Sequence, residues 1–280
     1  MTLATGPTGG ADFSLTGRVA IITGGAGLLG VRHAEAIAAA GGSPVIADLR
    51  GPAAIACAER IAATYRVPAL GVEVDITSLA SVESLLATVQ SRFGRADILV
   101  NNAANNPRVE GGGTDFSRFE SFSLDQWNAD VAVGLTGAYL CAQVVGRAMA
   151  AAKRGVIINI SSEYGLIAPD QRLYEREGVP PDEQLAKPVS YTVVKAGLHG
   201  LTIYLATYWA AAGVRVNTIT VGGVENGQPA GFLDRAASRV PMGRMARPTD
   251  FQGALVYLCS DAASFVTGAN LVVDGGKSVW

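Results

Sequence analysis

Short apolar runs alternate with longer alanine-rich stretches along most of the chain. The short runs, such as "RVAIIT" at 18–23, are rich in β-branched residues, which predicts buried strands. The longer stretches, such as "VRHAEAIAAAG" at 31–41, end at glycine, which is typical of helices. The pattern predicts strands at 18–23, 44–48, 69–74, 98–100, 156–160, 214–219 and 270–273. It predicts helices at 31–41, 53–65, 79–93, 124–152, 190–212 and 249–259.

This alternation predicts an α/β protein with a Rossmann fold, a doubly wound sheet of seven parallel strands with helices on both faces. The expected strands are apolar throughout because both faces of such a sheet are covered. No repeat and no linker divides the chain. We therefore expect one domain over 13–280, after a flexible tail at 1–12 that is rich in glycine and threonine.

Composition and charge narrow the classes of function. The net charge is −2 and only 16% of the residues are charged, so nothing favours nucleic acid or an anionic membrane as a partner. Two histidines and three separated cysteines (Cys57, Cys141 and Cys259) offer neither a metal site nor a disulfide framework, and we expect the cysteines to be buried. The N-terminus lacks the pattern of a signal peptide, which favours a cytoplasmic protein.

The stretch "TGGAGLLG" lies between the first predicted strand and the first predicted helix. Gly25, Gly27 and Gly30 fit a dinucleotide fingerprint, whereas Thr23, Gly24, Gly27 and Gly30 fit a spacing associated with sugar-nucleotide epimerases. In either case the glycines let the backbone approach a pyrophosphate, and the start of the helix supplies free N–H groups. The turn by itself predicts nucleotide binding and leaves the reaction open.

Two acidic residues at strand ends bear on the cofactor. Asp48 lies 18 residues after Gly30, where a carboxylate accepts both ribose hydroxyls of NAD and repels the 2′-phosphate of NADP. No basic residue lies inside the glycine turn, although Arg50 is close, so NAD is expected. Asp75 in "EVDIT" is placed to bind the adenine amino group. The alternatives are that Asp48 caps a helix or turn and that Asp75 caps the helix near Ser78.

The stretch "SYTVVK" places Tyr191 and Lys195 four residues apart on one face of a helix. An adjacent ammonium lowers the pKa of a phenol, which is otherwise near 10, so the pair can serve as a general acid and base. A surface pair at helical spacing is the alternative. "NISSEYG" favours the catalytic interpretation, because its two serines end a strand and can bind a reacting oxygen.

These motifs, together with "NNAA", "VRVNTI" and "LVVDGG", resemble the short-chain dehydrogenase/reductase family over 14–276. The resemblance implies that Tyr191 is the acid/base, that Ser162 orients the substrate oxygen and that Lys195 also holds the nicotinamide ribose. Only 85 residues follow Lys195, at 196–280, which fits the compact branch rather than the epimerases of the extended branch. The implied cofactor residues are Gly24, Gly27, Leu28, Leu29, Gly30, Asp48, Leu49, Asp75, Ile76, Asn102, Ala103, Ala104, Tyr191, Lys195, Val224 and Asn226.

The chain departs from the family pattern at several positions. Gly134 in "GLTG" stands where the family usually has an asparagine that holds a water of the proton relay. Ala104 replaces a glycine, Val221 a proline and Asn226 a threonine. Because Tyr191 and its lysine are intact, we interpret these as subfamily differences.

Ser162 and Tyr191 are 29 positions apart, more than is usual in the family. The intervening insert at about 166–189 is polar and must lie beside the active site, as a lid or substrate wall or else as a subunit-contact loop. Such a wall suits a polyhydroxylated or anionic substrate. The expected substrate residues are Glu163, Tyr164, Asn105, Arg108 and Arg172.

The sequence therefore predicts an NAD-dependent oxidoreductase that interconverts a secondary alcohol and a ketone on a sugar, sugar phosphate or polyol. The insert and the ending "GGKSVW" resemble dehydrogenases of bacterial surface-sugar and flagellin-modification pathways. Two alternatives are an epimerase that uses tightly held NAD and a non-catalytic NAD-binding regulator, which only Gly134 supports. Two long alanine-rich helices predict a homotetramer or homodimer.

Overall fold

A computed structural model describes residues 12–105 and 117–280. Its strands form one parallel sheet in the order β3-β2-β1-β4-β5-β6-β7, as predicted. The strands are β1 Val19–Thr23, β2 Ser43–Asp48, β3 Leu70–Glu73, β4 Ile98–Asn101, β5 Gly155–Ser162, β6 Val214–Val221 and β7 Asn270–Val273. The predicted tail lies almost wholly outside the described residues.

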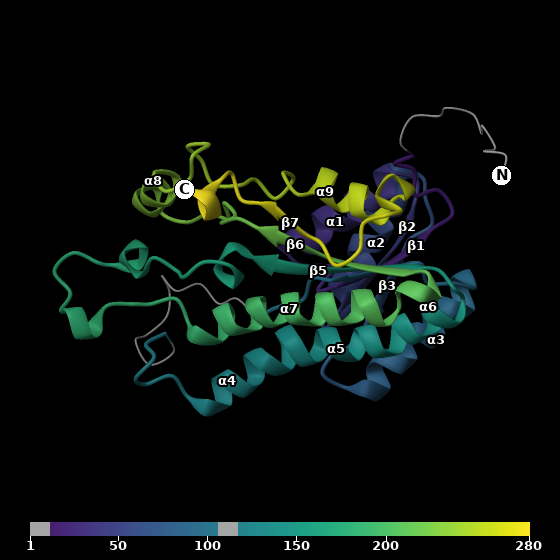
Figure 1. Ribbon diagram of the computed structural model, residues 1–280, viewed down its shortest axis with the longest axis horizontal. Coiled ribbons are helices and arrows are strands. Elements are labelled where there is room, and N and C mark those ends of the chain that lie inside the picture. The colour runs from purple at the N-terminus through teal and green to yellow at the C-terminus, as the bar shows by residue number, and fades with distance from the viewer. Residues whose placement is uncertain (1–11, 106–116) are drawn as a thin grey trace.

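Helices cover both faces of the sheet (Figure 1). They are α1 Leu28–Ala39, α2 Gly51–Tyr65, α3 Leu79–Phe93, α4 Leu124–Val131, α5 Gly137–Cys141, α6 Arg147–Ala151, α7 Val189–Tyr208, α8 Ala230–Ala237 and α9 Gln252–Cys259. Sequence analysis missed α8, which has only eight residues. It also ended the fifth and sixth strands early, because polar residues there continue the pairing of Ser161 with Thr220 and of Ser162 with Val221.

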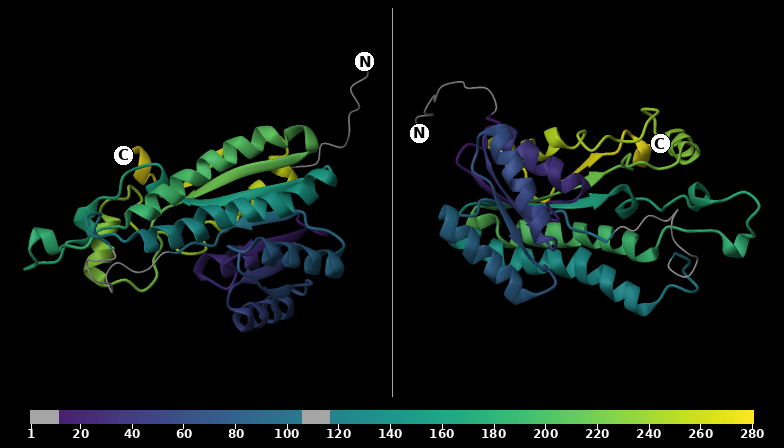
Figure 2. Two further views of the ribbon diagram at one scale, coloured as in Figure 1. Left: turned by 90° about the horizontal axis from the view of Figure 1, so that it is seen from below. Right: turned by 180° about the vertical axis from the view of Figure 1, so that it is seen from behind.

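Alternating residues of the central strands pack into two hydrophobic cores, one on each face of the sheet. Ala20 and Ile22 of β1 pack with α1, α2 and α9, whereas Val19 and Ile21 pack with α3, the α4–α6 run and α7. Figure 2 shows these two layers from below and from behind. All five residues of β1 are buried, as the apolar run predicts.

The helices α4, α5 and α6 form one helical run, Leu124–Ala151, with π-helical turns at Ala132–Thr136 and Ala142–Gly146. This run is long and apolar enough to cross a membrane. A core helix of a globular protein meets the same criteria, and this one packs Cys141 and Met149 into the core. The apolar composition of this helical run is therefore explained by its packing in the core.

The sheet order reverses between β1 and β4, which are neighbours although β2 and β3 lie between them in sequence. Ligands bind such sheets at the carboxyl ends of the strands beside this point. The glycine-rich turn follows β1 at that edge, and Ser162 ends β5 there. The insert, α8 and the C-terminus gather at the same end of the molecule (Figure 1).

Candidate active site

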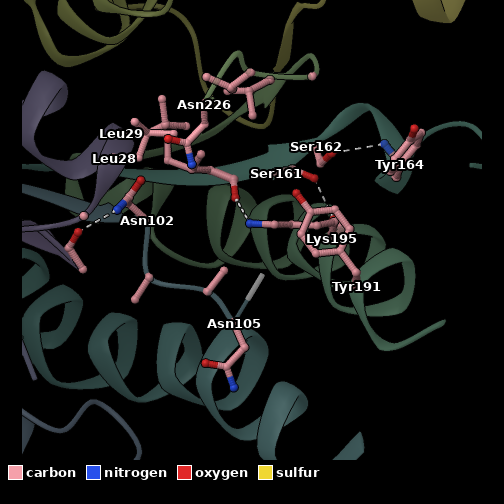
Figure 3. A pocket seen from close by; sticks show the side chains of 18 of the residues that line it. Leu28, Leu29, Asn102, Asn105, Ser161, Ser162, Tyr164, Tyr191, Lys195 and Asn226 are labelled. Carbon is pink, nitrogen blue, oxygen red and sulfur yellow. Dashed lines mark hydrogen bonds between the residues drawn. The ribbon is translucent and has the colours of Figure 1, made fainter. Parts of the chain in front are cut away.

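A cavity of about 610 Å³ runs along the carboxyl ends of the strands, from the glycine-rich turn to the C-terminal segment. Every predicted cofactor residue lines it except Gly30. Figure 3 shows Leu28, Leu29 and Asn102 toward one end and Tyr164 toward the other. Ser162 and Tyr191 lie between these ends. One continuous space thus joins the predicted nucleotide and substrate regions.

The glycine-rich turn is closed so tightly that side chains are excluded. A Cβ on Gly30 would lie 2.2 Å from the Gly24 carbonyl oxygen, which explains why Gly30 supports the turn from below without lining the cavity. Gly24 has φ +59, and a Cβ there would lie 3.0 Å from Ala103 Cα. No side chain caps α1 at Gly27, so its first N–H groups are left to a ligand. This cradle fits a dinucleotide pyrophosphate.

Asp48 is buried and binds the turn from the end of β2. Its Oδ2 accepts from the Ala26 N–H at 3.0 Å, and its Oδ1 accepts from the Arg50 N–H at 3.0 Å and from Arg50 Nε at 3.2 Å. The Arg50 guanidinium also donates to the Ala26 carbonyl at 3.2 Å. Asp48 and Arg50 both line the cavity. Asp48 therefore also stabilises the glycine-rich turn, which agrees with the alternative that it caps a turn.

The ends of β3 and β4 are fixed by local hydrogen bonds. Asp75 Oδ1 accepts from the Thr77 N–H at 2.9 Å and from Thr77 Oγ1 at 2.6 Å. The side chain that caps α3 is Ser78, so Asp75 is a turn residue beside the cavity rather than the helix cap. Asn102 Nδ2 donates to the Thr23 carbonyl at 2.9 Å and to the Gly24 carbonyl at 3.2 Å, which ties β4 to the glycine-rich turn.

Ser162, Tyr191 and Lys195 converge in the middle of the cavity (Figure 3). Lys195 is buried and its Nζ donates to the Ile160 carbonyl at 2.8 Å. Ser162 begins a 3-10 turn, and its Oγ accepts from the Tyr164 N–H at 3.3 Å. The strand end and the start of α7 thus bring together a hydroxyl, a phenol and an ammonium.

The pKa of Tyr191 differs from the sequence prediction. Burial raises it to about 12, while a hydrogen bond with Ser162 opposes the rise. Burial and the charge of Lys187 lower the pKa of Lys195 to about 8. The pKa of Tyr191 is therefore raised and not lowered as expected, because burial disfavours the phenolate and is the largest of the causes.

The two serines at the end of β5 have different partners. Ser161 Oγ donates to the Lys195 carbonyl at 2.8 Å and lies 3.1 Å from His199 Nε2. These contacts hold α7 against β5. Ser162 Oγ is the hydroxyl that interacts with Tyr191. A substrate oxygen between them would meet Ser162, as the family resemblance implies.

Gly134, which stands where the family usually has an asparagine, lies buried in the first π-helical turn. A Cβ there would lie 2.4 Å from Val194 Cγ1 on α7. Any side chain at this position, asparagine included, would have to displace Val194. The close contact between the two helices explains the glycine.

The comparisons with known proteins agree with this geometry. A family model described as "short chain dehydrogenase" matches residues 18–174, and one described as "Enoyl-(Acyl carrier protein) reductase" matches 182–278. The chain belongs to the short-chain dehydrogenase family. It is an oxidoreductase, as the dehydrogenases among its relatives are.

Two curated relatives and one solved structure illustrate the similarity. The chain is 35% identical to a D-threitol dehydrogenase of Mycolicibacterium smegmatis, covering 96% of this chain and 95% of that protein. It is 30% identical to an NAD-dependent glycerol dehydrogenase of Listeria innocua, covering 96% of each. A gluconate 5-dehydrogenase from Burkholderia cenocepacia in complex with NADP and tartrate has a TM-score of 0.84 at 30% identity, covering 96% of this chain and 98% of that one.

The insert of this short-chain dehydrogenase forms an apolar wall, contrary to the polar wall expected. Leu173 and Tyr174 from the insert pack with Phe232 and Ala236 of α8, and all four line the cavity. Of the insert's charged residues, Lys187 lines the cavity, whereas Asp170 and Arg172 do not. This apolar wall was missed because the charged residues dominate the composition of the segment.

Arg172 lies outside the cavity, which corrects its expected substrate contact. Its guanidinium binds Asp170 at 2.8 and 3.0 Å, and 74% of its side chain is exposed. Asp170 also accepts from Arg239 Nε at 2.7 Å, which docks the insert beside α8. Arg108 lies outside the described residues. Asn105 lines the cavity, and its Nδ2 donates to the Ala129 carbonyl at 3.4 Å.

Two lysines that sequence analysis did not single out also line the cavity. Lys187, at the end of the insert, places Nζ 4.0 Å from the centre of the Tyr191 ring. Lys277, near the C-terminus, places Nζ 2.5 Å from Glu163 Oε1 and 4.8 Å from the centre of the Tyr164 ring. The predicted substrate residues Glu163 and Tyr164 thus lie in the cavity, with a cation from a distant segment beside them.

Proposed function

We propose that this protein is an NAD-dependent dehydrogenase of a polyol. The observation that carries the proposal is the convergence of Ser162, Tyr191 and Lys195 in a cavity that runs from a dinucleotide cradle to the polar pair of Glu163 and Lys277. The names of the threitol and glycerol dehydrogenases among its relatives support the substrate class.

The glycine-rich turn, Asp48, Lys195 and Asn226 would hold the cofactor, which supplies a hydride acceptor when bound. Asp48 favours NAD because a carboxylate repels the 2′-phosphate of NADP. Arg50 is already bound to that carboxylate, which limits its attraction for the phosphate. The NAD-dependent glycerol dehydrogenase supports this choice, whereas the gluconate 5-dehydrogenase complex contains NADP.

The protein's own residues would move the proton. Ser162 Oγ donates to the carbinol oxygen and holds it beside Tyr191 Oη, which removes the hydroxyl proton during oxidation and returns it during reduction. The high pKa of Tyr191 suits it as the acid in reduction. For oxidation, the ammonium of Lys195 and the positive charge of oxidised nicotinamide would favour the phenolate.

We also propose a cytoplasmic homotetramer. Tyr139 of α5 and Ile203, Tyr204 and Tyr208 of α7 are exposed apolar side chains on the two long helical segments that cover one face of the sheet. Packing of these helices against a second copy would bury them. Sedimentation velocity measures the state, and a monomer would contradict it.

The direct test is to incubate the pure protein with NAD⁺ and a panel of polyols, sugars and sugar phosphates. NADH is followed optically and the substrate by NMR. The proposal expects ketone and NADH in equal amounts from a polyol, with Tyr191→Phe inactive. Conversion without NADH would identify an epimerase instead, and cofactor binding without any Tyr191-dependent turnover would support a regulator.

A further inference from the structure

The ion pair between Glu163 and Lys277 has no part in the proton transfer proposed above. It joins the residue after Ser162 to a residue 114 positions further along the chain. The Glu163 side chain is 2% exposed and that of Lys277 is 12% exposed. A buried charge is costly to maintain unless it has a partner, so a pair at this position calls for an explanation.

The turn that follows β7 positions Lys277 beside Glu163. Asp274 follows β7, and its carboxylate accepts from the Gly276 N–H and the Ser278 N–H, both at 2.8 Å. Gly275 and Gly276 have φ +67 and +89, where glycine is favoured. The turn reverses the chain, and Lys277 enters the cavity beside Tyr164.

One carboxylate oxygen of Glu163 is left over. Oε1 accepts from Lys277, and the backbone N–H of Gly223 is close enough to the carboxyl to lower its pKa, but Oε2 is shielded from solvent and has no hydrogen bond of good geometry among the described residues. Buried polar groups of proteins are nearly always hydrogen-bonded, and an unsatisfied carboxylate oxygen is especially costly. Because Glu163 lines the cavity, a bound molecule can supply the missing donor.

We propose that Glu163 accepts a hydrogen bond from a second substrate hydroxyl, on the carbon next to the one oxidised, and that Lys277 is the positioning residue that orients Glu163. This inference rests on the proposed polyol dehydrogenase activity. It makes the site specific for vicinal diols.

The adjacent carbon follows from the position of Glu163. Glu163 lines the same cavity as Ser162, which holds the reacting oxygen, and its charge is close enough to Tyr191 to raise the pKa of that phenol. A substrate whose carbinol lies between Ser162 and Tyr191 therefore brings its neighbouring carbon toward Glu163.

A neutral donor fits this place better than an anion. Lys277 is already paired with Glu163, and the free oxygen belongs to a carboxylate, so a substrate carboxylate or phosphate would be repelled. Burial opposes the charge of Lys277, but Glu163 and Tyr164 outweigh it and raise its pKa, so the ammonium persists. Leu173 and Phe232 offer apolar contact to the carbon side of the substrate.

Three four-carbon alcohols test the inference: threitol, 2,3-butanediol and 2-butanol. The last two differ by a single hydroxyl at the carbon next to the carbinol. Charge-assisted hydrogen bonds predict a kcat/KM about 10- to 100-fold higher for 2,3-butanediol than for 2-butanol. Glu163→Gln is expected to remove most of this preference, because only the diols lose a hydrogen bond, whereas the loss of the Glu163 charge beside Tyr191 acts on the diols and 2-butanol alike.

Variants of the lysine separate positioning from folding. Lys277→Met should raise KM for the diols more than it lowers kcat, and Lys277→Arg should restore part of the preference. Because Lys277→Met leaves a buried carboxylate alone, the double variant Glu163→Gln with Lys277→Met provides a form without either charge. It should fold and lack the diol preference. Glu59→Gln and Lys153→Met, at exposed positions on α2 and before β5, are matched controls with no expected effect.

The pH profile gives a readout that a purely structural pair would not move. Burial raises the pKa of Glu163, Lys277 and the backbone N–H of Gly223 partly oppose the rise, and the nearby carboxylate of Asp274 adds to it. Protonation of Glu163 removes the acceptor, so diol kcat/KM should fall as the pH falls through this pKa. This fall in diol kcat/KM should occur at higher pH in Lys277→Met, which lacks the opposing cation. It should be absent in Glu163→Gln once the pH dependence measured with 2-butanol is subtracted.

The outcomes separate the two proposals. Turnover of threitol that survives Glu163→Gln with an unchanged diol preference leaves the polyol dehydrogenase in place and overturns the role of Glu163. Equal wild-type activity on 2,3-butanediol and 2-butanol would likewise overturn the role of Glu163 and leave the polyol dehydrogenase in place. Failure of the wild type to oxidise any polyol overturns the proposed function, and the inference falls with it.

Discussion

The ammonium of Lys187 lies 4.0 Å from the centre of the Tyr191 ring. The insert thus places a second cation beside the phenol, nearer to the ring than Lys195, whose Nζ is 5.8 Å from the same centre. A cation over an aromatic ring contributes about 0.5 to 2 kcal/mol, and it favours a phenolate more than a phenol. The insert is therefore part of the acid/base environment as well as a wall of the cavity.

Replacing Lys187 with methionine should lower kcat for alcohol oxidation about fivefold at neutral pH. Without this cation the Tyr191 phenolate is less stable, so full oxidation activity should require a higher pH. The pKa of Lys195 should rise, because Lys187 now lowers it. Steady-state kinetics from pH 6 to 10 measure the effect. An unchanged profile would show that the contact is structural only.

The pKa of Tyr191 predicts opposite pH dependences for the two directions. Burial raises this pKa to about 12, so the base form is scarce at neutral pH and alcohol oxidation should rise with pH. Ketone reduction uses the protonated form and should fall at alkaline pH. Bound oxidised nicotinamide should move the oxidation limb to lower pH. A pH-independent rate in both directions would show that Tyr191 does not move the proton.

Asp48 is expected to set the cofactor preference. Asp48→Asn keeps the shape but removes the charge, so the ratio of the NADPH to NADH dissociation constants should fall about tenfold or more. Cofactor fluorescence in titrations measures both constants. Asp75→Asn is the matched control, because that carboxylate lies by the cavity within a local turn with Thr77. A ratio unchanged in Asp48→Asn would remove the basis for proposing NAD.

Gly134 should tolerate no side chain without a loss of stability. The Cβ of Gly134→Ala would overlap Val194, at a cost of about 1 to 3 kcal/mol, against a gain of about 1 kcal/mol in helix propensity. We expect a net loss of about 1 kcal/mol in the free energy of unfolding. Gly200→Ala on α7 is the control, since its Cβ would meet nothing within 4 Å and it should stabilise the protein. Denaturant unfolding compares the two, and a stabilised Gly134→Ala would contradict the account.

The sheet and the nucleotide end of the site could be predicted because their signals are local. The turn from Gly24 to Gly30 joins one strand to the next helix, and Asp48 ends the following strand, so each residue's place follows from its own element. Tyr191 and Lys195 share one helix face for the same reason.

The substrate end could not be predicted because it is assembled from segments far apart in the sequence. Lys277 reaches Glu163 only through the turn that follows β7, and no local pattern indicates that contact. Leu173 and Phe232 meet only because the insert docks against α8, a helix that the sequence pattern did not indicate. The charges of the insert suggested a polar wall, yet Asp170 pairs with Arg172 and Arg239 outside the cavity, and Lys187 is the charged residue of the insert that lines it.

The most direct test of the central claim uses threitol that carries deuterium on its carbinol carbons. The pure protein is incubated with this substrate and NAD⁺, and the reduced cofactor is examined by NMR. The account predicts deuterium on the nicotinamide ring in an amount equal to the ketone formed, and a loss of about 10³-fold in rate with Tyr191→Phe. Reduced cofactor without deuterium, or an undiminished rate in the variant, would contradict it.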